Sequence, residues 1–153
     1  MSTFEQAQVE SRRLATQALH IVRSSDDSNS KIGGLPQVWE GFVWPTWKGR
    51  SLSFLAQFDL REVAGAGAVD WLPTEGNLYF FYNQEQSTWG FDPADRGSWV
   101  VLYVSPVEYS MEATAPADLG PHVIFPSSSL KLRRITSYPS CQRLNIDARD
   151  MSQ

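Results

Sequence analysis

The chain has 153 residues, of which 42% are hydrophobic and 20% charged, and a formal net charge of −4. This length and composition fit a single globular core and exclude an intrinsically disordered chain, and no apolar run approaches the roughly 18 residues that a membrane-spanning helix needs. The polar and acidic N-terminus, MSTFEQAQVESRR, lacks the basic start and apolar stretch of a signal peptide, so we expect a cytoplasmic protein.

The first elements predicted along the chain are a helix and a strand. Thr3 is followed three residues later by Gln6, the spacing of a capping box, and residues 4–14 contain good helix formers without glycine or proline. Residues 18–22, ALHIV, are typical of a short strand before a polar loop. His20 lies within this strand, where we interpret it as a half-buried packing residue rather than a catalytic base.

Residues 30–60 are the most distinctive part of the sequence. Gly33 and Gly34 can adopt positive φ and the following Leu-Pro pair favours an extended path, so a sharp backbone corner is predicted. An aromatic loop follows, which we expect to cover one end of a β-core with the rings of Trp39, Phe42, Trp44 and Trp47. Residues 51–60 alternate as a strand whose second face includes Gln57, which we interpret as a buried structural anchor before a ligand-binding residue.

The rest of the chain completes a predicted sheet. Residues 64–69 (AGAGAV) are predicted as a flexible connector, and residues 106–129, with four prolines, as a long irregular segment. Further strands are expected at 77–83, which suits a central position, at 89–93 before a turn, at 99–105 and at 130–136. The predicted fold is therefore α+β, with an N-terminal helix and a mostly antiparallel sheet, in one domain over residues 1–139 followed by a tail at 140–153.

Charge is distributed unevenly along the sequence. Residues 1–50 carry six basic and five acidic residues, residues 51–125 two against ten, and residues 126–153 five against two. The acidic middle disfavours nucleic-acid binding and favours a partner of basic character. A simpler alternative is that these acids only solubilise one side of the domain, with the basic C-terminal residues folding back as counter-charge.

The sequence lacks the motifs of metal, cofactor or nucleophile chemistry. Cys141 is the single cysteine, and it and the two separated histidines, His20 and His122, do not have the spacing of a metal site, so we predict no metal and no cofactor. No catalytic residue is predicted. A hydrolase that uses a carboxylate pair such as Asp92 and Asp95 is the weaker alternative, and a cleft that holds both carboxylates beside His122 would favour it.

Five short motifs occur in an order and at spacings that together are specific: S-K-I-G-G-L-P at 30–36, W-P at 44–45, F-L-A-Q-F-D-L at 54–60, L-P at 72–73 and G-N-L-Y-F-F at 76–81. They resemble the YwqG-like family, bacterial domains without an assigned activity. The resemblance implies an α+β half-domain, since members of that family are longer and have a related second half. It transfers no catalytic residue. We expect the chain to be a short variant or a fragment, in which a second copy could replace the missing half as a homodimer.

The function that the sequence favours is that of a non-enzymatic protein-interaction domain, such as an immunity or antitoxin-type protein that binds a basic partner through an acidic surface. The candidate partner-binding residues are aromatic or acidic: Trp47, Tyr82, Glu85, Trp89, Asp92 and Asp95. The alternative is a small-ligand-binding domain with a pocket lined by Trp39, Trp44 and Gln57.

Overall fold

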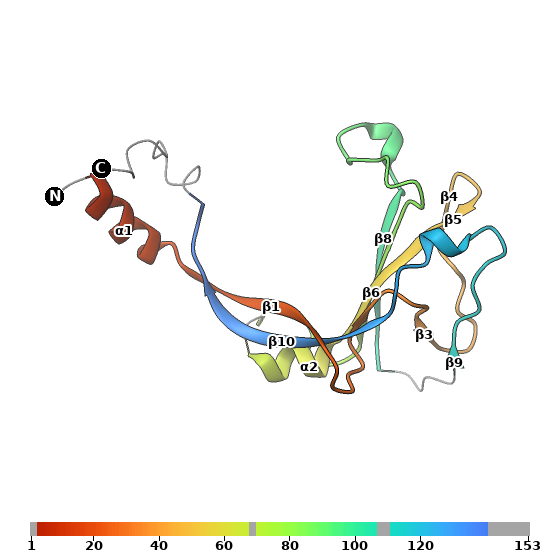
Figure 1. The fold of residues 1–153 in the computed structure, drawn as a ribbon, viewed down its shortest axis with the longest axis horizontal. Helices are drawn as coiled ribbons and strands as arrows, with labels where there is room; N and C mark the ends of the chain where they lie inside the picture. The colour runs from red at the N-terminus through yellow and green to blue at the C-terminus, as the bar shows by residue number, and fades with distance from the viewer. Residues whose placement is uncertain (1–2, 68–69, 107–110, 141–153) are drawn as a thin grey trace.

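The computed structural model describes residues 3–67, 70–106 and 111–140 of the chain (Figure 1). Their helices and strands are α1 (Thr3–Arg13), β1 (Thr16–Ser24), β2 (Lys31–Ile32), β3 (Gln37–Val38), β4 (Thr46–Trp47), β5 (Arg50–Ser51), β6 (Ser53–Asp59), α2 (Leu60–Ala66), β7 (Asn77–Tyr82), η1 (Pro93–Asp95), β8 (Trp99–Val104), β9 (Met111–Glu112), η2 (Pro121–Val123) and β10 (Ser128–Ser137).

The main sheet is antiparallel throughout, and its strands lie in the order β1, β10, β2, β6, β7 and β8. Two small sheets, one of β3 with β9 and one of β4 with β5, lie outside it. β7 lies between β6 and β8, which confirms the central position predicted for residues 77–83. The predicted fold class, α+β with an N-terminal helix and a mostly antiparallel sheet, is confirmed.

β1 and β10 form a long ribbon that carries α1 at its far end, away from the rest of the sheet (Figure 1). The two strands pair from Thr16 opposite Ser137 to Ser24 opposite Ser129, so both extend beyond their predicted ranges. Of these positions on β10, only Ser129 also pairs with β2, opposite Lys31. Most of the ribbon therefore extends beyond the other four strands of the sheet. His20 on β1 is exposed, so its interpretation as a half-buried packing residue is wrong.

A β-bulge in β6 changes which of its residues face the core. The pairing with β7 shifts between Phe54 and Ala56, so that Phe54 lies opposite Phe81 and Gln57 lies opposite Tyr79. Simple alternation places Phe54 and Gln57 on opposite faces, but the extra residue at the bulge brings them to the same face. Gln57 is covered there, as predicted, with only 3% of its surface exposed.

The core lies on this face of the sheet, beneath the aromatic loop. Its buried centre consists of Leu52, Phe54, Tyr79 and Phe81, against which the half-buried Trp39, Phe42, Trp44 and Trp47 pack. Trp44 meets Phe81 edge to face, with 5.7 Å between the ring centroids, and its Nε1 donates to the Leu52 carbonyl at 2.8 Å. The prediction that the aromatic loop covers one end of a β-core is confirmed.

Residues 60–66 form α2, so the prediction of a flexible connector at 64–69 is wrong for its first three residues; residues 68–69 lie outside the described part. Asp59 caps the helix by accepting from the Arg61 N–H at 2.8 Å, and Gly67 ends it in the left-handed conformation. Leu60 and Val63 are buried and anchor its inner face. Capping and burial thus outweigh the low helix propensity of the glycine-rich sequence.

The strand predicted at 89–93 is not formed. Residues 83–98 are instead a loop that contains η1, because the Asp92 and Asp95 side chains accept hydrogen bonds from nearby backbone N–H groups that a strand would need for pairing. The segment 106–129 is mostly irregular, as predicted, although it includes β9 and η2. Apart from Ser140, the tail predicted at 140–153 lies outside the described residues.

Candidate functional site

The most exposed aromatic surface lies at the end of the molecule where β7 turns into β8. We call it the tip surface: loop 83–98 together with the hairpin 46–51 formed by β4 and β5. Side chains join the two segments, since the Trp47 Nε1 donates to the Arg96 carbonyl at 2.9 Å and Arg50 pairs with Glu85. In Figure 1 the loop projects beyond the end of β8, away from the ribbon.

Two aromatic side chains of the loop stand almost fully in solvent. Trp89 is 81% exposed and Phe91 is 91% exposed. The backbone beneath them is fixed, because the Asp95 carboxylate accepts from the N–H groups of Trp89 at 3.2 Å and Gly90 at 3.1 Å. Asp92 caps η1 through the Ala94 N–H at 2.8 Å. The loop therefore presents both rings from an ordered turn.

The structure brings all six predicted partner-binding residues to the tip surface or its base, but in different environments. The Trp89 side chain is exposed, whereas Trp47 is half-buried against Gly97. Tyr82 is also half-buried, and its hydroxyl donates to the Thr88 carbonyl. Glu85 is exposed in its ion pair with Arg50, and Asp92 and Asp95 hold the turn. Sequence reasoning missed Phe91, because interpreting 89–93 as a strand assigned its ring to a sheet face.

The tip surface carries less net negative charge than the sequence pattern indicates. Hairpin 46–51 brings Lys48 and Arg50 next to the loop, where Lys48 lies over the Trp47 ring at 4.2 Å. Asp92 and Asp95 form no salt bridge with any described residue. The basic side chains of β10 lie elsewhere, on the ribbon, where Lys131 pairs with Asp26 at 3.2 Å.

The carboxylate pair proposed for a hydrolase has a structural use in the turn. Both Asp92 and Asp95 accept backbone hydrogen bonds, and neither contacts His122, which lies in η2, through any described interaction. General acid–base catalysis requires such groups within hydrogen-bonding reach of one another and of a substrate. This geometry gives the hydrolase alternative no support.

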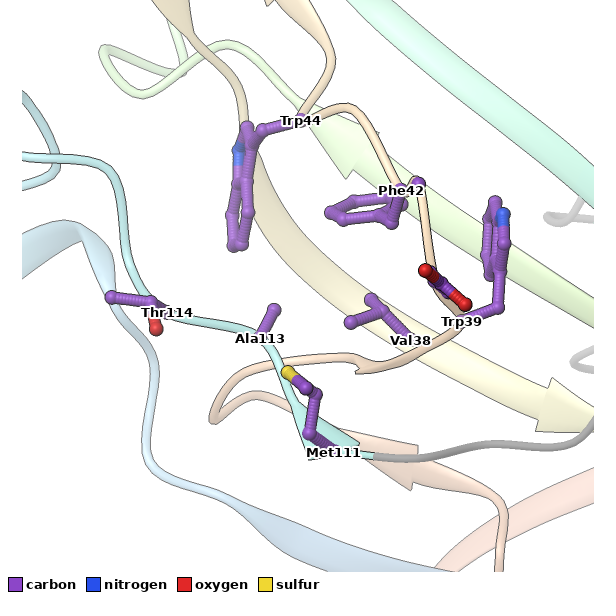
Figure 2. A pocket seen from close by; sticks show the side chains of 9 residues that line it. Val38, Trp39, Phe42, Trp44, Met111, Ala113 and Thr114 are labelled. Carbon is purple, nitrogen blue, oxygen red and sulfur yellow. The ribbon is translucent and has the colours of Figure 1, made fainter.

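An aromatic pocket of about 570 Å³ lies between the aromatic loop and residues 111–114 (Figure 2). Figure 2 shows Trp39, Phe42 and Trp44 along one side and Met111, Ala113 and Thr114 along the other. The three rings also contact one another: the distance between ring centroids is 5.2 Å for Trp39 and Phe42 and 5.9 Å for Phe42 and Trp44. Their packing over the core accounts for their position without a ligand.

A second, polar pocket of about 440 Å³ lies at the opposite end of β6 and β7 from the tip surface. Its lining consists of Ser28, Asn29, Lys31, Gln37, Gln57, Asp59, Arg61 and Asn77. Of the residues predicted to share one ligand pocket, Trp39 and Trp44 line the aromatic pocket, whereas Gln57 lines the polar one. Tyr79 lies between the two, in contact with Trp39 and donating its hydroxyl to the Gln37 carbonyl at 2.9 Å.

Glu62 of α2 holds the loop that forms one wall of the polar pocket. Its carboxylate accepts from the Ser28 hydroxyl at 2.8 Å, the Asn29 N–H at 2.9 Å and the Ser30 N–H at 3.1 Å. Burial raises the pKa of the Glu62 carboxyl, but the hydrogen bonds from Ser30, Asn29 and Ser28 together outweigh it and hold the pKa below its ordinary value. The charged form of Glu62 is therefore the one that the fold stabilises.

Glu62→Gln is expected to lower the free energy of unfolding by about 1–2 kcal/mol near neutral pH, since an amide replaces a carboxylate that accepts from several donors and is partly screened by solvent. Because the pKa is lowered by folding, this stabilisation is present above the ordinary carboxyl pKa of 4.5 and is lost as the pH falls through the folded-state value. Urea denaturation of both proteins should show their difference shrinking in acid. Glu40→Gln, at an exposed glutamate, is the control for the substitution itself; a constant difference for Glu62→Gln would contradict the assignment.

No helix among the described residues is long and apolar enough to cross a bilayer. The same part of the chain contains no group of three or more His, Cys, Asp or Glu side chains placed to hold a metal ion.

These features define an α+β domain with an exposed aromatic surface at one end and a polar pocket at the other. Residues 30–152 match the family described as Domain of unknown function (DUF1963), and the match covers most of the chain. The protein therefore belongs to this family. No curated protein matches the chain. The matched range begins at Ser30, so α1 and β1 lie outside it.

Proposed function

We propose that this domain is a non-enzymatic protein-interaction module and that the tip surface binds the partner. The observation that carries the proposal is the almost complete exposure of Trp89 and Phe91 on an ordered turn. Large aromatic side chains gain the most from burial and are frequent anchors at the centres of protein interfaces. Neither ring contributes to the core, so a binding role accounts for their position.

We infer that the partner has an apolar pocket for these rings with basic side chains around it, because Asp92 and Asp95 have no ion-pair partner among the described residues. An immunity or antitoxin-type protein that binds a basic partner in the cytoplasm is a function of this kind. The motifs at 30–36 and 54–60 further support a proposed relationship to the YwqG-like proteins within the family.

A second copy of the chain is the other candidate partner, and it would bind along β8, which follows loop 83–98 of the tip surface. In the described part of the sheet β8 is an edge strand, and Trp99, Val101 and Tyr103 on its outer face are about half exposed. Apolar edge strands of this kind pair readily with another chain. The molar mass of the purified protein in solution distinguishes a homodimer from a monomer that awaits a different partner.

The tip surface is tested by replacing both exposed rings. The Trp89→Ala/Phe91→Ala variant should fold like the native protein and bind its partner about 100-fold or more weakly, since each anchor contributes strongly to an interface. The measurement is quantitative capture from native lysate, followed by the dissociation constant of the captured protein. Trp71→Ala, which removes another 80% exposed tryptophan outside the tip surface, is the control. Equal losses in both variants, or none in the double variant, would contradict the proposal.

A further inference from the structure

The polar pocket is built by strand register. Lys31 lies opposite Gln57 in the β2–β6 pair, and Asp59 lies opposite Asn77 in the β6–β7 pair. Gln57 and Asp59 are two positions apart on β6, so their side chains leave the same face of the sheet. Lys31, Gln57, Asp59 and Asn77 therefore form one polar patch on the core face of the sheet, next to the buried aromatic core.

Lys31 gives the pocket a shielded positive charge. Only 13% of its side chain is exposed, and among the described residues its one ion pair joins Nζ to the Glu112 carboxylate at 3.4 Å. The Glu112 side chain is itself 55% exposed, so water screens its charge and weakens the pair. A shielded ammonium with one long, screened contact has donors left for an anionic ligand.

Asp59 gives the pocket a negative charge without a cationic partner in the described structure. One of its carboxylate oxygens accepts from the Arg61 N–H at 2.8 Å and the other from the Asn29 side-chain amide at 3.1 Å. The Arg61 guanidinium instead pairs with Glu75 at 3.7 Å. Since a carboxylate can accept about four hydrogen bonds, Asp59 can still accept from a ligand ammonium.

The wall between the two charges is fixed. The Gln57 amide donates to the Asn29 carbonyl and accepts from the Gln37 N–H, both at 2.9 Å. The Asp59 N–H donates to the Ser30 hydroxyl at 3.0 Å. Because these groups are already positioned, binding a ligand here requires little ordering of the protein.

We propose that this pocket binds a small zwitterion of the size of a free amino acid, with the ligand carboxylate on Lys31 and the ligand ammonium on Asp59. The opposite charges of the two side chains, their common face and the pocket of about 440 Å³ that both of them line fit a ligand that carries both charges a few bonds apart. This pocket and the tip surface lie at opposite ends of β6 and β7. Zwitterion binding in the pocket and partner binding at the tip surface can therefore be tested independently of each other.

The direct test uses the free proteinogenic amino acids as probes. Each is added to the full-length protein, and its effect on the melting temperature and on the backbone amide resonances of Asn29, Gln57 and Asn77 is measured. At least one should raise the melting temperature in a concentration-dependent way and shift these resonances. Its N-acetyl and carboxamide derivatives, which each lack one charge, should bind about 10- to 100-fold more weakly.

Two variants should change affinity in opposite directions. Lys31→Met should weaken binding about 10- to 100-fold. Glu112→Gln should strengthen binding about 2- to 5-fold, because it removes the negative charge that competes with the ligand carboxylate for Lys31. Lys48→Met, at an exposed lysine of the tip surface, is the matched control and should leave the affinity unchanged.

The proposal is overturned if no amino acid affects the protein, if the derivatives bind as well as the zwitterion, or if Lys31→Met binds like the control. Should Lys31→Met fail to fold, the derivatives and Glu112→Gln still decide, because the first comparison uses the native protein and the second changes a half-exposed side chain.

Discussion

Gly33→Ala is expected to lower the free energy of unfolding by about 3–5 kcal/mol, a large part of the stability of a domain this size. Gly33 has φ +68°, and a β-carbon there would lie 2.3 Å from the Pro126 carbonyl oxygen and 2.8 Å from that of Phe125. Both are backbone atoms, so no side-chain rotation relieves the contact. Its N–H also donates to the Leu55 carbonyl at 2.8 Å, and displacement would disturb this bond to β6.

Gly49→Ala separates the clash from the backbone preference. Gly49 has φ +76°, but nothing lies within 4 Å of the β-carbon that would be added. This variant should therefore lose only the cost of the left-handed conformation, about 1–2 kcal/mol. The two are compared by urea denaturation of the purified proteins. Similar losses would show that the segment 125–127 moves aside easily and that the double-glycine corner does not depend on close approach.

The corner at Gly33 is also where the sequence was most informative. Two successive glycines before Leu-Pro predict a sharp turn whatever lies around them, because backbone sterics alone require it. The aromatic loop and the five long strands, β1, β6, β7, β8 and β10, were likewise predictable, since their apolar residues are periodic or large enough to demand burial. What the local sequence could not show is that the corner packs against residues 125–127, which are distant along the chain.

The bulge at Leu55 explains the main error in the predicted face assignment. Alternation in residues 51–60 is regular, and nothing local marks the position where an extra residue enters the pairing. That extra residue brings Gln57 to the face of Tyr79 and next to Lys31 and Asn77, which belong to other strands. The polar pocket is therefore a product of register, which sequence periodicity alone does not determine.

The sequence grouped six residues that lie at the tip surface or its base, but it missed Phe91 and did not indicate the charge of this surface. Aromatic and acidic residues cluster in 82–95, and this much is visible in the sequence. The positive charges that reduce its net negative charge belong to Lys48 and Arg50. Arg50 precedes its ion-pair partner Glu85 by 35 residues in the sequence. A charge count by segment omits such neighbours, so the segment 51–125 looked more acidic than the surface to which it contributes.

Gln57→Leu is expected to lower the free energy of unfolding by about 2–4 kcal/mol, although leucine is similar in size and more hydrophobic. The Gln57 amide is 3% exposed and satisfies both the Gln37 N–H and the Asn29 carbonyl. Leucine leaves these two backbone groups without their partner, and each unsatisfied buried group costs about 1–3 kcal/mol. Urea denaturation measures the loss, with the exposed Gln8→Leu as the control for the change in side chain alone.

Gln57→Glu separates the hydrogen bonds from the packing. A glutamate keeps the shape and still accepts from the Gln37 N–H, but its charged form cannot donate to the Asn29 carbonyl. Protonation restores that donor, so the deficit of Gln57→Glu relative to the native protein should shrink as the pH falls, whereas that of Gln57→Leu should not. If the leucine variant proves as stable as Gln8→Leu, the buried amide does not anchor the loop at Asn29. The polar pocket would then lack the fixed wall on which tight binding of a small zwitterion depends.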